Sequence, residues 1–360
     1  MNRMNPTSLA TLRWIGTVLA ACTLAALTAA SARAATGVTV LPATSQDGPV
    51  TVFYPTAADS VPTKRGPFTV NIAANTMPER GNGRLIMVSH GSGASAWVYN
   101  DLAQHLVAEG FIVAIPEHAG DNWHDHSKLG PPSWKLRPLE VSRAIDAITQ
   151  DTRFAPLVDA QRVGVWGMSA GGHTALALAG GRWSPARLLS HCEAHLVEDF
   201  AACTGAATSL NGNAWDGIKK AVAMPLIRWH LSGDEAWYGH TDARIRAIVA
   251  GVPVAADFDL ATLAKPVVPL ALIQAEQDLW LVPKFHSGPV IDACKTCELL
   301  ASLPTAGHGA LLAPLPPDNP ARIQRLLTDP PGFNRAELPA LYGRISGFFN
   351  KHLMVDNPKP

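Results

Sequence analysis

Residues 163–172 read Val163-Gly164-Val165-Trp166-Gly167-Met168-Ser169-Ala170-Gly171-Gly172. The segment opens with an apolar run, continues with the pattern Gly-x-Ser-x-Gly around Ser169, and passes into the small apolar residues of Gly172–Ala179. This order predicts a buried strand that turns sharply into a helix, because the glycines leave room for a tight turn. The turn would hold Ser169 in a strained conformation, with its hydroxyl above the sheet and near the positive end of the helix dipole.

Apolar runs of strand length also lie on both sides of this segment. They are Leu85–Ser89, Phe111–Ile115, Val222–Leu226, Val268–Gln274 and Leu299–Leu303. Segments with helical apolar spacing lie between them, at Tyr99–Glu109, Leu139–Gln150 and Gly172–Ala179. Continuously apolar strands that alternate with helices indicate an α/β fold with a mostly parallel, doubly wound sheet. Right-handed crossovers would bring the loops after the strands to one edge of that sheet.

Three further features complete the expected fold. Two short β-rich runs at the start, Val50–Tyr54 and Phe68–Ile72, predict antiparallel strands. Residues 187–210 interrupt the strand order, and we expect them to form a small insertion over the sheet edge. Arg335–His352 has apolar residues on one face and predicts a closing helix. Because no internal repeat or linker is present, we expect one domain over residues 35–360.

The composition excludes several classes of protein. The 360 residues carry 29 basic and 29 acidic side chains, so the formal net charge is zero. That balance argues against a nucleic-acid partner, which would need a basic face, and against a polybasic protein held at a membrane surface by charge. With 47% apolar and only 16% charged residues, the chain can bury a large core and is not disordered.

The first 34 residues have the pattern of a secretory signal peptide. Arg3 and Arg13 precede an apolar run from Trp14 to about Ala30, and Ser31-Ala32-Arg33-Ala34 offers an A-x-A cleavage site. We therefore expect a periplasmic or secreted protein with no stable membrane span after cleavage. An alternative is a lipoprotein signal, because Leu19-Ala20-Ala21-Cys22 resembles a lipoprotein box that would anchor the chain at Cys22.

Cleavage would remove one of the five cysteines and leave Cys192, Cys203, Cys294 and Cys297. Four cysteines in an oxidising compartment predict two disulfides, with three possible pairings. Closeness in sequence favours Cys192–Cys203 and Cys294–Cys297. The Cys-x-x-Cys at 294–297 could instead be redox-active or bind a metal, but it lacks a thioredoxin context and a second ligand pair.

A serine at such a turn needs a base, and the base needs an orienting acid. In chain order the candidates are Ser169 as the nucleophile, Asp278 as the acid and His308 as the base. Asp278 and His308 each follow an expected strand, at the edge where Ser169 would lie. Glu276 and Asp234 are rival acids, since both also lie beyond expected strands.

The residues around this candidate triad have expected roles too. The backbone N–H groups of Ala170 and Ser92 would stabilise a developing negative charge, and His90 would brace the Ser92 loop. Trp123 and Trp280 follow strand ends and could line a substrate pocket. Five polar residues crowd one loop, namely His118, Asp121, His124, Asp125 and His126. We interpret that loop as a cleft lining rather than a metal site, because a triad of this kind requires no metal and no cofactor.

Three motifs resemble those of the dienelactone hydrolase-like branch of the α/β-hydrolases. They are Ser89-His90-Gly91-Ser92-Gly93, Gly167-Met168-Ser169-Ala170-Gly171-Gly172, and Glu117-His118-Ala119-Gly120-Asp121-Asn122 after the strand at Phe111. The platelet-activating-factor acetylhydrolases are also similar, and the resemblance covers roughly residues 50 to 310. It implies an α/β-hydrolase fold and hydrolysis of a small-molecule carboxylic ester through an acyl-enzyme.

The chain departs from these relatives at two points. Dienelactone hydrolases use Cys as the nucleophile, whereas position 169 is Ser, which argues against dienelactone as the substrate. The acetylhydrolases carry their acid after an earlier strand, but the matching stretch, Ala221–Ile227, holds no carboxylate and so favours Asp278. We therefore expect an exported serine esterase. The alternatives are an amidase or peptidase, a polyesterase, and a non-catalytic binding protein of the same fold.

Overall fold

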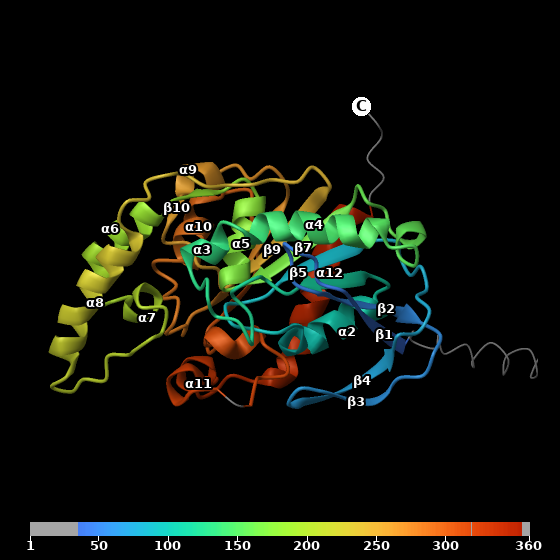
Figure 1. The fold of residues 1–360 in the computed structure, drawn as a ribbon, viewed down its shortest axis with the longest axis horizontal. Helices are drawn as coiled ribbons and strands as arrows, with labels where there is room; N and C mark the ends of the chain where they lie inside the picture. The colour runs from blue at the N-terminus through green and yellow to red at the C-terminus, as the bar shows by residue number, and fades with distance from the viewer. Residues whose placement is uncertain (1–34, 318, 355–360) are drawn as a thin grey trace, which may run out of the picture. The chain divides into compact units, whose positions relative to one another are not determined.

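A ten-stranded, mostly parallel sheet forms the centre of the part of the chain that the structure describes (Figure 1). The computed structural model describes residues 35–317 and 319–354. The expected signal peptide, residues 1–34 with Cys22, lies outside the described residues. Residues 35–360 form one compact unit by themselves.

The strand order is β12-β11-β9-β7-β5-β6-β2-β1-β4-β3. Six neighbouring strands, from β12 to β6, run parallel, whereas β2 is antiparallel to both β6 and β1. In chain order the ten strands are β1 (Ala35–Leu41), β2 (Val50–Thr56), β3 (Val61–Arg65), β4 (Phe68–Ala74), β5 (Leu85–Ser89), β6 (Ile112–Pro116), β7 (Val163–Met168), β9 (Ile245–Gly251), β11 (Leu270–Ala275) and β12 (Glu298–Leu303). The expected α/β class with a mostly parallel sheet is thus confirmed.

Helices cover both faces of this sheet. One face packs against α2 (Asn100–Ala108) and α12 (Leu338–Leu353), and the other against α4 (Arg137–Gln150) and α5 (Ala170–Leu178). Each face has its own cluster of buried apolar side chains. Strands β5, β6 and β7 are buried along their whole length, as their continuous apolar sequences predict.

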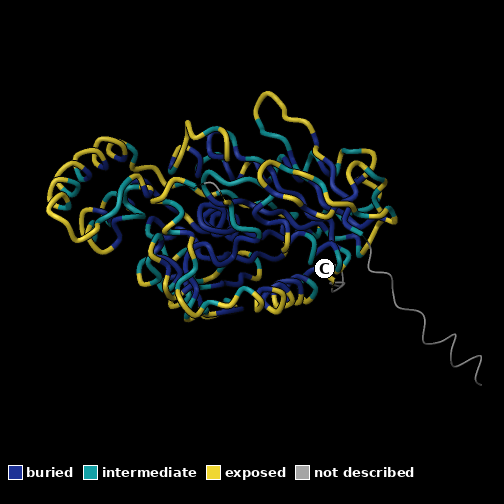
Figure 2. The backbone as a smooth tube through the Cα atoms, turned by 90° about the horizontal axis from the view of Figure 1, so that it is seen from below, coloured by how far each residue is buried: buried dark blue, intermediate teal, exposed yellow. Residues whose placement is uncertain are grey.

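The expected strand at Val222–Leu226 is wrong, because these residues lie in the middle of helix α8 (Asp216–Leu231). Strand β9, at Ile245–Gly251, takes the place in the sheet that this segment was expected to fill. The insertion before β9 is also longer than residues 187–210. It comprises α6 (Pro185–His195), α7 (Phe200–Cys203) and α8, and its helices are among the more exposed parts of the chain (Figure 2).

Both disulfides favoured by closeness in sequence are present. Cys192 of α6 is bonded to Cys203 of α7, and Cys294 is bonded to Cys297 in the turn before β12. Smaller elements complete the chain, namely η1 (Ala96–Tyr99), α3 (Pro131–Trp134), η2 (Ala155–Leu157), β8 (Arg182–Trp183), β10 (Phe258–Asp259), α9 (Leu260–Leu263), α10 (Ser287–Ala293), η3 (His308–Leu311), α11 (Ala321–Leu327) and η4 (Arg335–Glu337). Across residues 35–317 and 319–354, no helix is long and apolar enough to cross a membrane.

Candidate active site

Ser169 occupies the turn between β7 and α5, one residue before the helix begins. Its φ of 59° and ψ of −119° fall in a region that residues other than glycine rarely adopt. Its N–H donates to the Gly251 carbonyl at 3.1 Å, and its own carbonyl accepts from the N–H groups of His173 and Val254. The surrounding backbone therefore fixes Ser169 in a strained conformation at the carboxyl end of a central strand.

The two glycines of the Gly-x-Ser-x-Gly pattern are required by close backbone contacts. A Cβ atom on Gly167 would lie 2.0 Å from the carbonyl oxygen of Gly171. One on Gly171 would lie 1.8 Å from the carbonyl oxygen of Ser89 at the end of β5. Both distances are far below any tolerable contact, so the turn needs glycine at both positions.

The structure brings Ser169, His308 and Asp278 together in one chain of hydrogen bonds. Ser169 Oγ lies 3.0 Å from His308 Nε2, and His308 Nδ1 lies 2.7 Å from Asp278 Oδ2. With Nδ1 donating to the carboxylate, Nε2 is left free to accept the serine proton. The three residues come from the ends of β7, β11 and β12, which meet at one edge of the parallel sheet.

Asp278 is held in place by its own neighbours. Its second oxygen, Oδ1, accepts hydrogen bonds from the backbone N–H groups of Trp280 and Leu281, each at 2.8 Å. The rival acids are engaged elsewhere: Asp234 pairs with Lys135 and accepts from the Tyr238 hydroxyl, and Glu276 accepts from a serine of β12. Of the three carboxylates, only Asp278 is hydrogen-bonded to His308.

Two backbone N–H groups are available to bind an anion beside Ser169. Ala170 is the first residue of α5, so its N–H has no acceptor within the helix. The N–H of Ser92 donates to no other group among residues 35–317 and 319–354. Its loop adjoins Ser169, since a Cβ atom built on Gly91 would lie 3.5 Å from that of Ser169.

A buried ion pair holds the Ser92 loop. Asp121 Oδ2 binds the Arg137 guanidinium at 2.8 Å, and neither side chain is exposed to solvent. The other carboxylate oxygen accepts from Ser92 Oγ at 2.6 Å and from the Gly93 N–H at 2.9 Å. Burial alone would raise the pKa of Asp121, but the Arg137 charge and these hydrogen bonds outweigh it and lower the pKa to about 2. Tyr99 adds a further brace, because its hydroxyl accepts from the Gly91 N–H at 2.8 Å.

A second serine–histidine–carboxylate chain lies directly behind this loop. Ser89 Oγ is 2.8 Å from His118 Nε2, and His118 Nδ1 is 2.6 Å from Glu140 Oε2. Burial keeps the pKa of His118 well below its usual value, so the ring is neutral. Ser89 has no exposed surface, whereas Ser169 retains 9%. The buried chain therefore supports the structure of the loop, and of the two serines only Ser169 is accessible from solvent.

His90 also stays within this buried network. Its Nδ1 donates to the Gly91 carbonyl at 2.7 Å, and its Nε2 accepts from the His118 N–H at 3.2 Å. Burial, followed by the nearby His118, lowers its pKa well below the usual value. A neutral ring with both nitrogens bonded to backbone groups supports the loop.

The remaining predicted residues are placed as follows. The Trp280 ring lies 5.0 Å from the ring of His308, at the candidate site. Trp123 is 62% exposed, donates to Glu117 and stacks edge-on against His124. Among the described residues, the hydrogen-bond and ring contacts of Trp123 are with Glu117 and His124 and not with Ser169, Asp278 or His308. Within the described parts of the chain, no group of His, Cys, Asp or Glu has the arrangement of a metal site, including the loop at 118–126.

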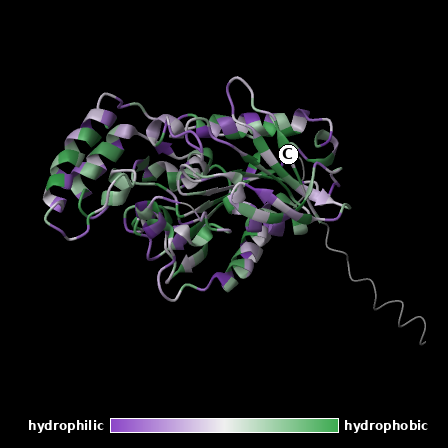
Figure 3. Cartoon of the chain, turned by 60° about the horizontal axis from the view of Figure 1, so that its bottom comes forward, coloured by the Kyte–Doolittle hydropathy of each residue, from purple (hydrophilic) through white to green (hydrophobic). Residues whose placement is uncertain are grey.

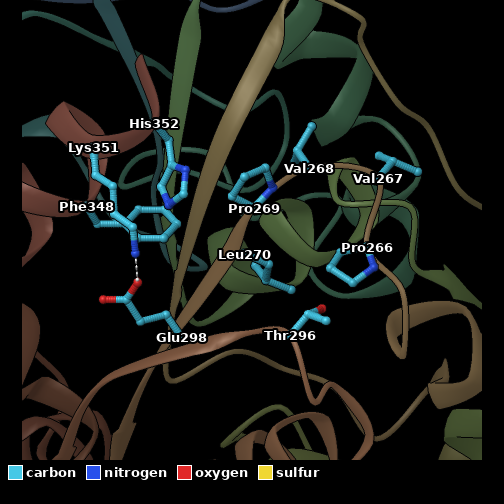
Figure 4. Close-up of a pocket in the computed structure, with 10 residues that line it drawn as sticks. All are labelled: Pro266, Val267, Val268, Pro269, Leu270, Thr296, Glu298, Phe348, Lys351 and His352. Atoms are coloured by element: carbon cyan, nitrogen blue, oxygen red, sulfur yellow. Dashed lines mark hydrogen bonds and ion pairs between the residues drawn. The ribbon is translucent and has the colours of Figure 1, made fainter. Parts of the chain in front are cut away.

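A pocket of about 370 Å³ lies at the opposite edge of the sheet (Figure 4). Its lining comes from the starts of β11 and β12 and from the end of α12, with an ion pair between Glu298 and Lys351 at 3.0 Å. The pocket lies at the amino ends of the parallel strands, whereas Ser169 lies at the carboxyl end of β7. This pocket is therefore separate from the candidate site.

No protein-family model matches the chain, and no curated protein matches its sequence. Sequence reasoning missed the roles of Arg137 and Glu140, because each lies far along the chain from the loop that it supports. Both are buried on the inner face of helix α4. Only Glu140 falls within the helix predicted at Leu139–Gln150, where a charged residue beside apolar ones was the available sign.

Proposed function

We propose that the protein is a serine hydrolase of the α/β-hydrolase fold that cleaves carboxylic esters. The hydrogen-bonded series Ser169–His308–Asp278 is the observation that carries the proposal. The strained turn at Ser169, the two free N–H groups beside it and the order of the three residues along the chain all support it.

The reaction proceeds in two halves. Ser169 Oγ attacks the ester carbonyl carbon while His308 Nε2 takes the hydroxyl proton, and the carbonyl oxygen becomes an oxyanion bound by Ala170 and Ser92. Collapse of this tetrahedral species breaks the carbon–oxygen bond, and the leaving alcohol takes the proton from His308. Asp278 stabilises the imidazolium and fixes the tautomer throughout.

The second half releases the acid. Water attacks the acyl group on Ser169 and gives its proton to His308. The second tetrahedral species then expels Ser169 Oγ, which recovers the proton. Apart from the attacking water, all groups that these steps require are side chains or N–H groups of the chain itself, and the reaction needs no cofactor.

An exported location fits this proposal. The two disulfides are typical of a periplasmic or secreted protein. An amidase or peptidase would use the same residues, but no observation favours an amine leaving group over an alcohol. A polyesterase would also use them.

Hydrolysis of p-nitrophenyl acetate and p-nitrophenyl butyrate by residues 35–360 tests the proposal. We expect turnover by the native chain and, for Ser169→Ala, a loss of at least about 10³-fold in kcat, because the nucleophile is removed. Ser89→Ala is the matched control, since it removes the serine of the buried second chain; any change should be small beside that of Ser169→Ala. Absence of activity in the native chain would refute the proposal and favour a binding protein, whereas full activity in Ser169→Ala would refute Ser169 as the nucleophile.

A further inference from the structure

His308 lies between two glycines in a short segment that follows β12, the last strand of the sheet. It is the first residue of η3, a 3₁₀ helix of only four residues. A helix of this length has few internal hydrogen bonds, so it cannot by itself fix the position of its first side chain. Because His308 Nε2 must stay within hydrogen-bond distance of Ser169 Oγ, other groups have to hold η3 in place.

The chain before His308 is tied to the segment that holds Asp278. The carbonyl oxygen of Ala306 accepts from the Gln277 N–H at 3.0 Å, and the Ala306 N–H donates to the Leu303 carbonyl at 3.2 Å. The acid and the segment that leads into the base are therefore joined by backbone hydrogen bonds. The chain that follows His308 needs a support of its own.

Arg335, the first residue of η4, supplies that support. Its Nη1 donates to the carbonyl oxygen of Leu312 at 2.6 Å, and its Nη2 donates to that of Gly309 at 3.1 Å. Gly309 directly follows His308, and Leu312 directly follows the end of η3. Arginine side chains commonly bind the last carbonyl groups of a helix in this way. The two bonds therefore fix η3 at both of its ends.

Asp329 fixes the guanidinium of Arg335 in turn. Its two carboxylate oxygens accept from Nε and Nη2, the latter at 3.1 Å. Such a two-pronged contact with a carboxylate sets the plane of the guanidinium as well as its distance. The planar fork is what allows one side chain to bind a carboxylate and two carbonyl groups at once, and a lysine ammonium has no such fork.

The chain around Asp329 also packs directly against η3. A Cβ atom on Gly309 would lie 2.0 Å from the carbonyl oxygen of Leu327, the last residue of α11. No side chain fits between these two backbones, so the residue after His308 lies against the end of α11. Asp329 follows Leu327 by two residues, and its ion pair with Arg335 therefore joins two segments that both contact η3.

We propose that Arg335 is a positioning residue for the reaction, which keeps His308 Nε2 aligned with Ser169 Oγ by holding η3 against the end of α11. Arg335 acts through the backbone of Gly309 rather than on the reacting atoms. The inference rests on the proposed hydrolysis, because alignment of His308 matters only if His308 is the base. A shift of a catalytic group by about 1 Å can cost about 10²-fold in rate.

The kinetics of Arg335→Ala on p-nitrophenyl butyrate test the proposal. We expect kcat to fall by about 10–100-fold and KM to stay within about twofold, because the base is misaligned while the groups that bind the substrate are unchanged. Arg335→Lys should lose a similar factor, since an ammonium cannot bind all three partners. Arg344→Ala is the matched control. Arg344 of α12 also donates to a backbone carbonyl, at 3.1 Å, but that carbonyl belongs to Leu300 in β12; kcat should stay at the native value.

Chemical rescue separates a loss of alignment from general damage to the fold. The Arg335 side chain is 30% exposed, so a small cation can enter the space that Arg335→Ala leaves. Ethylguanidinium can pair there with Asp329 and donate to the two carbonyl groups, and should raise kcat of Arg335→Ala by at least about threefold. It should leave kcat of the native chain and of Arg344→Ala unchanged.

Urea unfolding establishes that each variant is folded before its kinetics are compared. Native kcat in Arg335→Ala would overturn the role of Arg335 and leave the proposed hydrolysis intact, whereas an inactive native chain would refute the hydrolysis itself. A loss that ethylguanidinium does not restore, or a rise in KM in place of a fall in kcat, would also overturn the proposal. If Arg335→Ala does not fold, Asp329→Asn provides the test: it releases the guanidinium and should lower kcat by about tenfold, and an unchanged kcat would refute the role of Arg335.

Discussion

The backbone conformation of Ser169 is sterically unfavourable for a residue that has a Cβ atom. A non-glycine residue in this region of φ and ψ costs about 1–3 kcal/mol. Ser169 is held there because its N–H donates to Gly251 and its carbonyl accepts from His173 and Val254. The strain serves a purpose, because it directs the hydroxyl to His308 at the end of the strand.

A pair of substitutions at this position measures the strain. Ser169→Ala and Ser169→Gly both remove the hydroxyl and its bond to His308, but only glycine adopts the conformation without cost. We expect the free energy of unfolding of Ser169→Gly to exceed that of Ser169→Ala by about 1 kcal/mol in urea denaturation, even after the greater flexibility of glycine in the unfolded chain. Equal stabilities would contradict the assignment of strain.

The role of Asp278 can be separated from that of its rival. Asp278→Asn places an amide against His308 Nδ1 and favours the wrong tautomer, so we expect kcat for p-nitrophenyl butyrate to fall by about 10⁴-fold. Asp234→Asn alters only contacts remote from His308, namely those to Lys135, Ala236 and Tyr238, and should keep kcat within a few-fold of the native value. If Asp234→Asn abolished turnover while Asp278→Asn did not, the assignment of the acid would be reversed.

At the scale of elements, the insertion depends on tertiary links more than on its own helices. The Cys192–Cys203 disulfide joins α6 to α7, and Asp199 of the same turn accepts hydrogen bonds from His191 and from His286 of the core. These links hold a segment that has a mostly exposed third helix. The disulfide thus joins two helices within the insertion, whereas the Asp199–His286 hydrogen bond and buried apolar residues of the insertion, such as Leu188 and Phe200, connect it to the core.

Removal of the disulfide should loosen this segment. For Cys192→Ser/Cys203→Ser we expect the free energy of unfolding to fall by about 2–3 kcal/mol, the cost of freeing a loop of this length. Limited proteolysis should then cut the insertion faster than in the native chain, with new cleavage sites between residues 195 and 215. Cys294→Ser/Cys297→Ser serves as the comparison, and it should leave cleavage in the insertion unchanged.

The strand–turn–helix at Ser169 could be predicted because local sequence and tertiary packing agree there. Its apolar run became β7, and the small residues after it became α5. The prediction for the segment around Val222 was wrong because local sequence and tertiary packing disagree there. The unbroken apolar run Val222–Leu226 suggests a buried strand. In the structure these residues, Pro225 included, lie in helix α8, which has an exposed apolar face. Figure 3 shows hydrophobic bands along the helices of the insertion, at the left of the view. Periodicity cannot separate these outcomes over so short a run.

The candidate site could likewise be predicted only in part. Ser169, Asp278 and His308 follow apolar runs, and parallel strand ends meet at one edge, so their meeting could be predicted. The support of the Ser92 loop by Asp121 and Arg137 could not. That contact depends on how helix α4 is rotated against the sheet, which sequence spacing does not determine.

At the scale of the whole molecule, two buried carboxylates link folding to pH. Burial would raise the pKa of Asp199, as it would that of Asp121, but hydrogen bonds from His191 and His286 outweigh burial and lower it to about 2. A carboxyl whose pKa is lower in the folded than in the unfolded state stabilises the fold above its unfolded pKa of about 3.9. That contribution is lost as the pH falls towards 2.

We therefore expect the free energy of unfolding to decline between about pH 4 and pH 2, with each of these two aspartates contributing on the order of 2 kcal/mol. Urea denaturation at pH 5 and pH 2.5 measures the decline. Asp121→Asn and Asp199→Asn should each be less stable at pH 5 and lose less on acidification than the native chain. If the free energy of unfolding of an Asn variant changes with pH as it does in the native chain, that carboxylate does not contribute to the decline.

The place of the insertion also governs the order in which the sheet is completed. Strand β9 lies between β7 and β11, yet more than seventy residues, including the whole insertion, separate it from the end of β7. A chain that emerges from a translocation channel N-terminus first therefore holds β7 with one edge open while α6, α7 and α8 are delivered. An open central strand invites pairing with a neighbouring chain. In the export that we propose, the chain would thus be most prone to aggregation during this interval, after Ser169 has emerged and before the strands that precede Asp278 and His308 have arrived.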